Sequence, residues 1–153
     1  MTDNRQSGLS LLEVLVSVAI FAFGLLALAA LMANGLRSNT SAMHRSFATN
    51  QVYDMADRMR ANPDTNYDGI AGAAADPGCI STGCSPARML QYDQFQWNTD
   101  NANFLPGGTG TVAKETAACV FANPNPCIYT ITVTWDDDRD GNADDSFVFA
   151  IRP

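Results

Sequence analysis

The sequence predicts an α+β protein in which a long N-terminal helix packs against a small antiparallel β-sheet. Two observations carry this prediction. An apolar run of 24 residues, Leu9–Met32, continues without a strong helix breaker as far as Asn62-Pro63. Near the other end, Tyr129–Trp135 alternates strictly between apolar residues and threonine, as a strand with one buried face does. The 153 residues leave roughly 90 for one modest globular part, near the size where disulfides help.

The apolar run is long enough to cross a bilayer as one helix, and it carries a single charge, Glu13. Three interpretations are open. A secretory signal would explain Ala27-Leu28-Ala29 as a cleavage site, although the segment before the run lacks the basic character of such signals. A plain single-pass anchor explains the length but not the carboxylate. In the third interpretation a polar leader is cut after Gly8, and the new ammonium at Leu9, of the same or a neighbouring chain, neutralises Glu13.

The residues around this cut resemble a known family. Gly8-Leu-Ser-Leu-Leu-Glu13 resembles the start of type IV pilins and pseudopilins, which have Gly before the cut, an apolar first mature residue and Glu at the fifth mature position. Two departures are the first mature residue, Leu9, where Phe or Met is commoner, and a leader with one basic residue, Arg5. Further segments resemble minor pilins of the PilV type, namely Arg37–Ala42 and Tyr53–Pro63 and, more loosely, Leu105-Pro-Gly-Gly and the C-terminal strand with Trp135-Asp136.

The resemblance implies a non-enzymatic, low-abundance subunit that primes type IV pilus assembly near the pilus tip and serves cell adhesion and twitching motility. Its implied partners are prepilin peptidase, other minor pilins, the major pilin and a large tip adhesin. The N-terminally methylated chain would span the inner membrane once, with a periplasmic head, before joining the pilus fibre at the cell surface. Two alternatives remain open: a minor pseudopilin of a type II secretion system, and a calcium-dependent adhesive module on a membrane anchor.

The second half of the helix is expected to be amphipathic. Its apolar residues mostly recur in steps of three, four or seven, namely Leu36, Met43, Phe47, Val52, Met55 and Met59. Asp54 and Arg58 form a favourable i,i+4 pair, and Pro63 ends a helix of roughly 80 Å that runs from residue 9 to residue 61. We expect Met43, Met55 and Met59 in the core, and His44, the only histidine, as a solvated or packed side chain. The chain then divides into a leader (1–8), a membrane or filament-core segment (9–32), an amphipathic segment (33–61) and a globular head (62–153).

The C-terminal part should begin with a loop over residues 64–87, which are rich in Gly, Ala, Asp and Pro. A short helix is expected within 89–104, with Tyr92, Phe95 and Trp97 as an apolar cluster, and Leu105-Pro-Gly-Gly should form a turn. Strands are expected at 109–112, 118–121, 128–135 and 146–151.

The four cysteines form two close pairs, Cys79/Cys84 and Cys119/Cys127. Spacings of five and eight suit local disulfides better than zinc, which favours Cys-x2-Cys pairs. Three connectivities are possible; the sequential one is favoured, and the alternative to disulfides is free thiols in a cytosolic core. Disulfides would place the head in an oxidising compartment. From residue 61 onward twelve acidic residues face four basic ones, so nucleic-acid binding is not expected.

One motif suggests a metal site. Between two expected strands, an acidic turn places oxygen ligands at positions 1, 3, 5, 7 and 9 of a calcium loop: Asp136, Asp138, Asp140, Asn142 and Asp144. Gly141 supplies the bend at position 6, but Phe147 stands where a bidentate Glu belongs, so the loop is not an EF-hand. Calcium binding and a simple acidic hairpin turn both remain open. No residue pattern suggests catalysis.

Overall fold

The structure is a computed structural model that describes residues 10–116, 118–121 and 127–153. It consists of two compact units, Met1–Thr40 and Ser41–Pro153, and we call the second the head unit. Helix α1 (Leu11–Ala61) contributes to both. Its 51 residues correspond to about 77 Å of helix, and its last turn carries the basic residues Arg58 and Arg60, which favour the negative end of a helix dipole.

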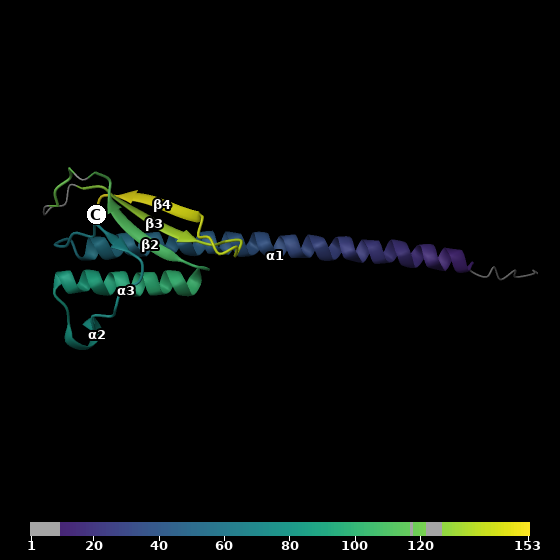
Figure 1. Cartoon of the computed structure of the whole chain (residues 1–153), viewed down its shortest axis with the longest axis horizontal. Helices are drawn as coiled ribbons and strands as arrows, with labels where there is room; N and C mark the ends of the chain where they lie inside the picture. The colour runs from purple at the N-terminus through teal and green to yellow at the C-terminus, as the bar shows by residue number, and fades with distance from the viewer. Residues whose placement is uncertain (1–9, 117, 122–126) are drawn as a thin grey trace, which may run out of the picture. The chain divides into compact units, whose positions relative to one another are not determined.

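The head unit contains a four-stranded antiparallel sheet in the order β1-β2-β3-β4 (Figure 1). The strands are β1 (Ile70–Ala71), β2 (Thr109–Lys114), β3 (Tyr129–Trp135) and β4 (Asp145–Ile151). In β3 every second residue is buried, as its alternating sequence predicted. Thr111, Thr132 and Val148 lie in one cross-strand row on the other face of the sheet. The predicted α+β fold, a long helix packed on a small antiparallel sheet, is confirmed.

Two further helices complete the head unit: α2 (Cys79–Thr82) and α3 (Pro86–Phe104), which begins with a proline at a position where helices tolerate it. The core joins α1, α3 and the inner face of the sheet. Its largest fully buried side chains are Trp97, Trp135, Tyr67, Tyr129, Met55 and Met59. The α1 residues that reach this core are Ala48, Val52, Met55, Ala56 and Met59, in the short steps that one helix face requires.

Several local expectations were wrong. Met43 was expected in the core but is 50% exposed, because the buried stripe of α1 passes through His44 and Ala48 instead. Residues 118–121 form no strand among the described residues; this segment is tied back at Cys119 by its disulfide and by the Lys114 ammonium, which donates to the Cys119 carbonyl. The expected loop at 64–87 contains β1 and α2, and α3 is longer than the predicted helix. Trp97 enters the core, whereas Tyr92 and Phe95 are half-buried beside each other.

A buried polar network fastens α1 to α3. The predicted pair is present, with Arg58 Nε donating to Asp54 at 2.7 Å, but Arg58 also donates to Asp93 on α3 at 3.2 Å. The Tyr67 hydroxyl donates to the other oxygen of Asp93 at 2.6 Å and accepts from Asn62 at 3.1 Å. Burial, and next the hydrogen bond to Asp93, raise the pKa of Tyr67, so the phenol stays protonated at physiological pH. Within this network each buried polar group therefore has a partner, as burial requires.

Two disulfides join sequential cysteines, Cys79–Cys84 and Cys119–Cys127. The first closes the segment that contains α2, and the second closes the segment before β3. Loops of five and eight residues remove limited entropy from the unfolded chain, about 2–3 kcal/mol each in the chain-entropy model.

Replacing Gly110 with alanine should strongly destabilise the head unit. A Cβ at this β2 position would lie less than 3.0 Å from ring atoms of Trp97 and from the Asn101 amide. The ring cannot easily yield, because Trp97 is fully buried and its Nε1 donates to the Gln51 carbonyl at 2.8 Å. Overpacking of this kind costs about 1–3 kcal/mol or more. Denaturant unfolding of a fragment of residues 33–153 measures the loss.

Gly35→Ala is the matched control, because a Cβ there meets nothing within 4 Å. It should leave the unfolding midpoint unchanged or slightly raised. An equal midpoint for Gly110→Ala and the parent fragment would show that the contact between β2 and Trp97 is looser than described.

Candidate functional site

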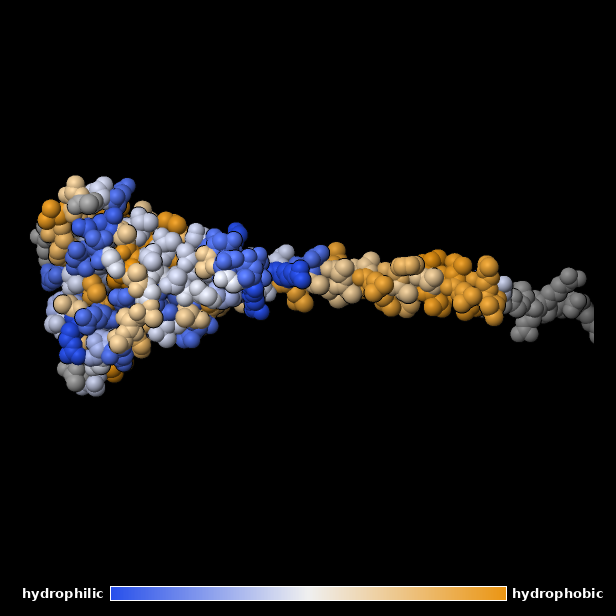
Figure 2. Space-filling view, viewed as in Figure 1, coloured by the Kyte–Doolittle hydropathy of each residue, from blue (hydrophilic) through white to orange (hydrophobic). Residues whose placement is uncertain are grey.

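The N-terminal half of α1 is apolar, and its side chains have no packing partner within the described chain. Its large hydrophobic residues are 48–78% exposed: Leu11, Leu12, Val14, Leu15, Val16, Val18, Ile20, Phe21, Phe23, Leu25, Leu26, Leu28, Leu31, Met32 and Leu36. Figure 2 shows this apolar surface over α1 before the head unit. Among the described residues α1 is the one helix long and apolar enough to cross a membrane, judged by length and composition. Such a surface requires lipid or other apolar helices around it.

Glu13 lies in the first turn of this helix. Helix α1 starts at Leu11, and the Ser10 carbonyl accepts from the N–H groups of Glu13 and Val14 at 3.0 and 3.2 Å. Ser10 is therefore the cap residue and Glu13 the third helical residue, the spacing of a capping box. This capping-box spacing was not among the sequence-based predictions, although Ser-x-x-Glu before an apolar run indicates it. A carboxylate here is also favoured by the positive end of the helix dipole.

Residues 3–29 match the family model described as the prokaryotic N-terminal methylation motif. The chain has a type IV prepilin-like N-terminus. The match covers both sides of the expected cut and most of the exposed apolar half of α1, and it does not extend into the head unit. No significant match was found among curated proteins or among solved structures.

The prepilin-like N-terminus implies processing by a prepilin peptidase and assembly with other pilins in a membrane system. Gly8 and Leu9, the residues on either side of the expected cut, lie outside the described residues. Glu13 is described and lies within the matched segment. The candidate assembly segment is therefore the apolar half of α1 with one carboxylate in its first turn.

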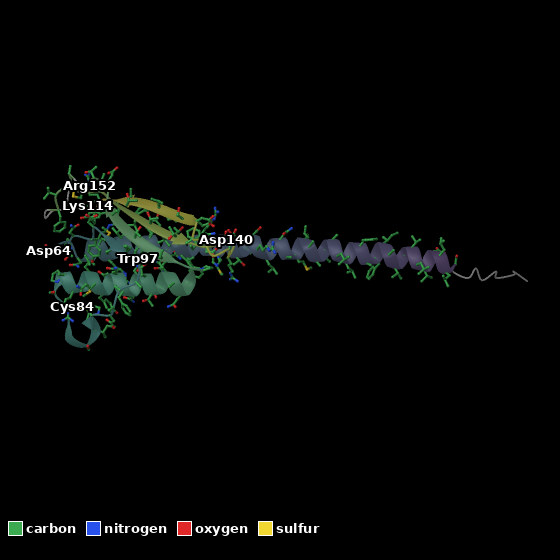
Figure 3. All side chains as sticks on the ribbon, in the orientation of Figure 1. Asp64, Cys84, Trp97, Lys114, Asp140 and Arg152 are labelled. Carbon is green, nitrogen blue, oxygen red and sulfur yellow. A yellow bond between two sulfur atoms is a disulfide. The ribbon has the colours of Figure 1, made fainter. Side chains whose placement is uncertain are left out.

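The second candidate is the acidic turn between β3 and β4 (Figure 3, near Asp140). Asp136 organises it: one carboxylate oxygen accepts from the N–H of Asp140 at 3.1 Å and the other from the N–H of Gly141 at 2.9 Å. Gly141 has a φ of 96°, which favours glycine and permits the sharp bend. Asp140 in turn accepts from the backbone and side-chain N–H groups of Asn142 at 2.8 and 3.1 Å.

The turn brings three of the five expected metal ligands together. Carboxylate oxygens of Asp136, Asp138 and Asp140 lie within 4.8 Å of one another. Calcium binds oxygen at 2.3–2.6 Å, so ligands of one ion are at most about 5 Å apart, and the three carboxylates fit one shared cation. Asp144 does not belong to this group, and the remaining ligands would be amide or carbonyl oxygens or water. No cofactor is thereby established.

The electrostatics of the turn favour an added positive charge. The strongest single influence on Asp138 is the N–H of Asp140, which lowers its pKa. The negative charge of Asp140, then burial, a hydrogen bond with Asp136 and the charge of Asp144 together outweigh this effect and raise the pKa of Asp138. Like-charge repulsion of this kind disfavours the ionised carboxylate.

Calcium should raise the melting temperature of fragment 33–153 if the three carboxylates share an ion. At a tenfold excess of calcium over its dissociation constant, mass action would contribute about 1.4 kcal/mol. In Asp138→Asn the amide oxygen can still accept from the Asp140 N–H while one charge is lost. This variant should be no less stable without calcium and should lose the calcium response. A melting temperature that is flat across millimolar calcium, with EDTA as reference, would show that the turn is only a hairpin connection.

The acidic turn is also fastened to α1 within the head unit. His44 is 4% exposed, and its Nδ1 lies 2.7 Å from a carboxylate oxygen of Asp137. Hydrogen bonds from Ser41 and next from His44 lower the pKa of Asp137 against the effect of burial. At the far end of the turn Arg45 lies 3.8 Å from Asp145. These contacts join residues about 90–100 positions apart, and they were not predicted because no local sequence pattern indicates them.

Asp137 should stabilise the head unit at neutral pH and not in acid. Because the folded-state pKa is below the unfolded value, the contribution is present above the unfolded pKa, about 3.9, and is lost as the pH falls through the folded pKa. Asp137→Asn should therefore lower the unfolding free energy of fragment 33–153 at pH 7, with the difference shrinking below pH 4. A difference that is constant from pH 7 to pH 3 would contradict an ionic contribution.

Ser41, His44 and Asp137 do not form a catalytic triad in this arrangement. His44 Nδ1 contacts the carboxylate, but among the described residues no hydrogen bond joins the Ser41 hydroxyl to the imidazole, as a Ser-His-Asp nucleophile requires. The geometry instead suits a structural clamp between the turn and α1.

Proposed function

We propose that the protein is a minor pilin that helps to prime type IV pilus assembly and is incorporated near the pilus tip. The observation that carries this proposal is the methylation motif at residues 3–29, on a helix whose apolar side chains are exposed in the isolated chain. Cleavage after Gly8 would leave that helix as a membrane anchor, and bundling with other pilins would later replace lipid around it. A small disulfide-bridged head on such a helix suits export and assembly better than a soluble role.

The minor-pilin assignment, as opposed to the broader family, rests on the resemblance of Arg37–Ala42 and Tyr53–Pro63 to the PilV type. The second segment includes Asp54 and Arg58, whose hydrogen bonds help to hold α3 against α1. In this proposal prepilin peptidase processes the chain in the inner membrane. Other minor pilins, the major pilin and a large tip adhesin are then its assembly partners, and the fibre carries it to the cell surface.

Two other functions fit particular observations. The methylation motif equally fits a minor pseudopilin of a type II secretion system. The grouped carboxylates of Asp136, Asp138 and Asp140 fit a calcium-dependent adhesive module. The neighbouring genes would distinguish the minor pilin from the pseudopilin: genes for other minor pilins and an adhesin indicate the former, and genes for secretion components indicate the latter.

Deleting the gene and counting surface pili by electron microscopy tests the proposal. A minor pilin that primes assembly predicts a severe loss of pili that the intact gene restores. Normal pili with failed protein secretion would indicate the pseudopilin. Normal pili and secretion with lost, calcium-dependent surface binding would indicate the adhesive module.

A further inference from the structure

One edge of the head-unit sheet is unpaired in the part of the chain that the structure describes. Strand β4 pairs with β3 in an unbroken register, from Tyr129 opposite Ile151 to Trp135 opposite Asp145. Nothing described pairs with its other edge. The opposite edge of the sheet ends in β1, which is two residues long and adjoins an ion pair of Lys114 and Asp68 at 3.5 Å. The long free edge is therefore on β4 alone among the described strands.

This edge lacks the usual protection against strand pairing. From Ser146 to Ile151 the strand reads Ser-Phe-Val-Phe-Ala-Ile, without charge, glycine or proline, and its regular register with β3 contains no bulge. Val148, in the middle, is 56% exposed. Natural proteins commonly blunt edge strands with charges, proline, bulges or short length. Without them the free N–H and C=O groups are a template for an added strand.

Two contacts show that β4 runs in the same direction as α1 in the head unit. Arg45 lies 3.8 Å from Asp145, and the ring of Tyr53 lies 5.2 Å from that of Phe149. The step from Arg45 to Tyr53 is about 12 Å of helix, and the step from Asp145 to Phe149 is about 13 Å of strand. The contacts therefore advance together along both elements, and Figure 1 shows the β4 arrow pointing toward the C-terminal end of α1.

We propose that the free edge of β4 binds a β-strand of a different membrane-anchored filament subunit, running parallel to β4. This inference rests on the proposed function as a filament subunit. Antiparallel pairing of two copies would point the α1 helices of their head units in opposite directions. In both copies, however, the segment that precedes Ser41 must enter the same bilayer. For a subunit built like this one, whose strand runs in the same direction as its own anchor helix, membrane anchoring therefore selects parallel pairing.

The charges at the ends of β4 disfavour a second copy as that strand. If two copies paired in parallel and in register, Asp144 and Asp145 of one copy would lie opposite Asp144 and Asp145 of the other, and Arg152 would lie opposite Arg152. Like charges directly opposite each other destabilise strand pairs. Figure 3 shows Arg152 at the opposite end of the hairpin from Asp140, so these charges are separated along the edge. The fitting strand carries a basic side chain level with Asp144 and Asp145, on a subunit other than this one.

Photo-crosslinking in the producing bacterium tests the edge directly. A benzophenone amino acid is placed in the full-length chain at Val148, with Thr111 as the matched control position. Both residues are exposed and lie in the same cross-strand row, but Thr111 is two strands from the β4 edge. Position 148 should give a cross-link severalfold stronger than position 111, and peptide mass spectrometry should place it in a strand of another membrane-anchored subunit.

The direction of the partner strand is tested by moving the crosslinker to Ser146 and Ala150. Parallel pairing predicts that position 150 reaches a residue further toward the partner's C-terminus than position 146 does. The reverse order, a cross-link to a second copy, a cross-link to a protein without an anchor, or equal yields at 148 and 111 would each overturn the proposal.

Val148→Lys supplies an independent measurement, since a lysine on the edge strand opposes strand addition. It should lower surface pili severalfold at normal levels of mature protein, whereas Thr111→Lys should not. The length of the chain in the same strains shows whether the leader has been removed. This measurement distinguishes a failure of the proposed function from a failure of the edge inference. An uncleaved chain would contradict the proposed function, whereas a cleaved chain that assembles equally well with Val148→Lys would contradict the edge inference alone.

Discussion

Replacing Glu13 with alanine should leave the chain cleaved and inserted in the membrane but poorly incorporated into filaments. In the cleaved chain with Glu13 intact, the Glu13 carboxylate is a charge in apolar surroundings. The ammonium of a docked neighbour would neutralise it only in the correct axial register. A loss of about 1.4 kcal/mol at the docking step lowers the docking constant tenfold, so we expect surface pili to fall about tenfold or more. Electron microscopy of pili and pull-down of partner subunits measure the effect.

The capping-box spacing of Ser10 and Glu13 provides a matched control. Glu13→Gln keeps a side chain that can cap the helix start but removes the charge. Pairing with an ammonium predicts that Gln is nearly as defective as Ala, whereas helix capping predicts that Gln restores assembly. Normal pili and normal pull-down with Glu13→Ala would instead mean that the carboxylate reaches the membrane surface and pairs with nothing.

Replacing Gly8 with valine should abolish leader removal. The peptidase must bring catalytic groups close to the backbone at the cut, and a branched side chain there would obstruct the approach. The full-length precursor should accumulate in the inner membrane, and mature chain should be absent by mass spectrometry and immunoblotting. No pili dependent on this subunit should then form.

Gly24→Val is the control for this substitution. It makes the same change inside the apolar half of α1, where a Cβ meets nothing within 4 Å. It should be cleaved normally. Mature-length protein from Gly8→Val would rule out a prepilin cut at this position, and loss of cleavage in both variants would point to a general failure of membrane insertion.

The sequence by itself determined the features that depend on local pattern. The apolar run and the periodic residues up to Asn62-Pro63 predicted α1 almost to its ends, since helix periodicity and a proline stop act over a few residues. Strict alternation predicted β3 and its buried face. The methylation motif is equally local, because it lies within one contiguous segment, residues 3–29, and depends on no contact with distant residues.

Only the tertiary structure decided which side chains meet across the head unit. It placed His44 rather than Met43 in the buried stripe, because Asp137, 93 residues away, supplies a partner that makes burial of an imidazole favourable. It likewise set the close approach of Gly110 to Trp97. β4 was predicted as a strand, but its free edge follows from the order of all four strands, which depends on long-range pairing that no local sequence pattern records.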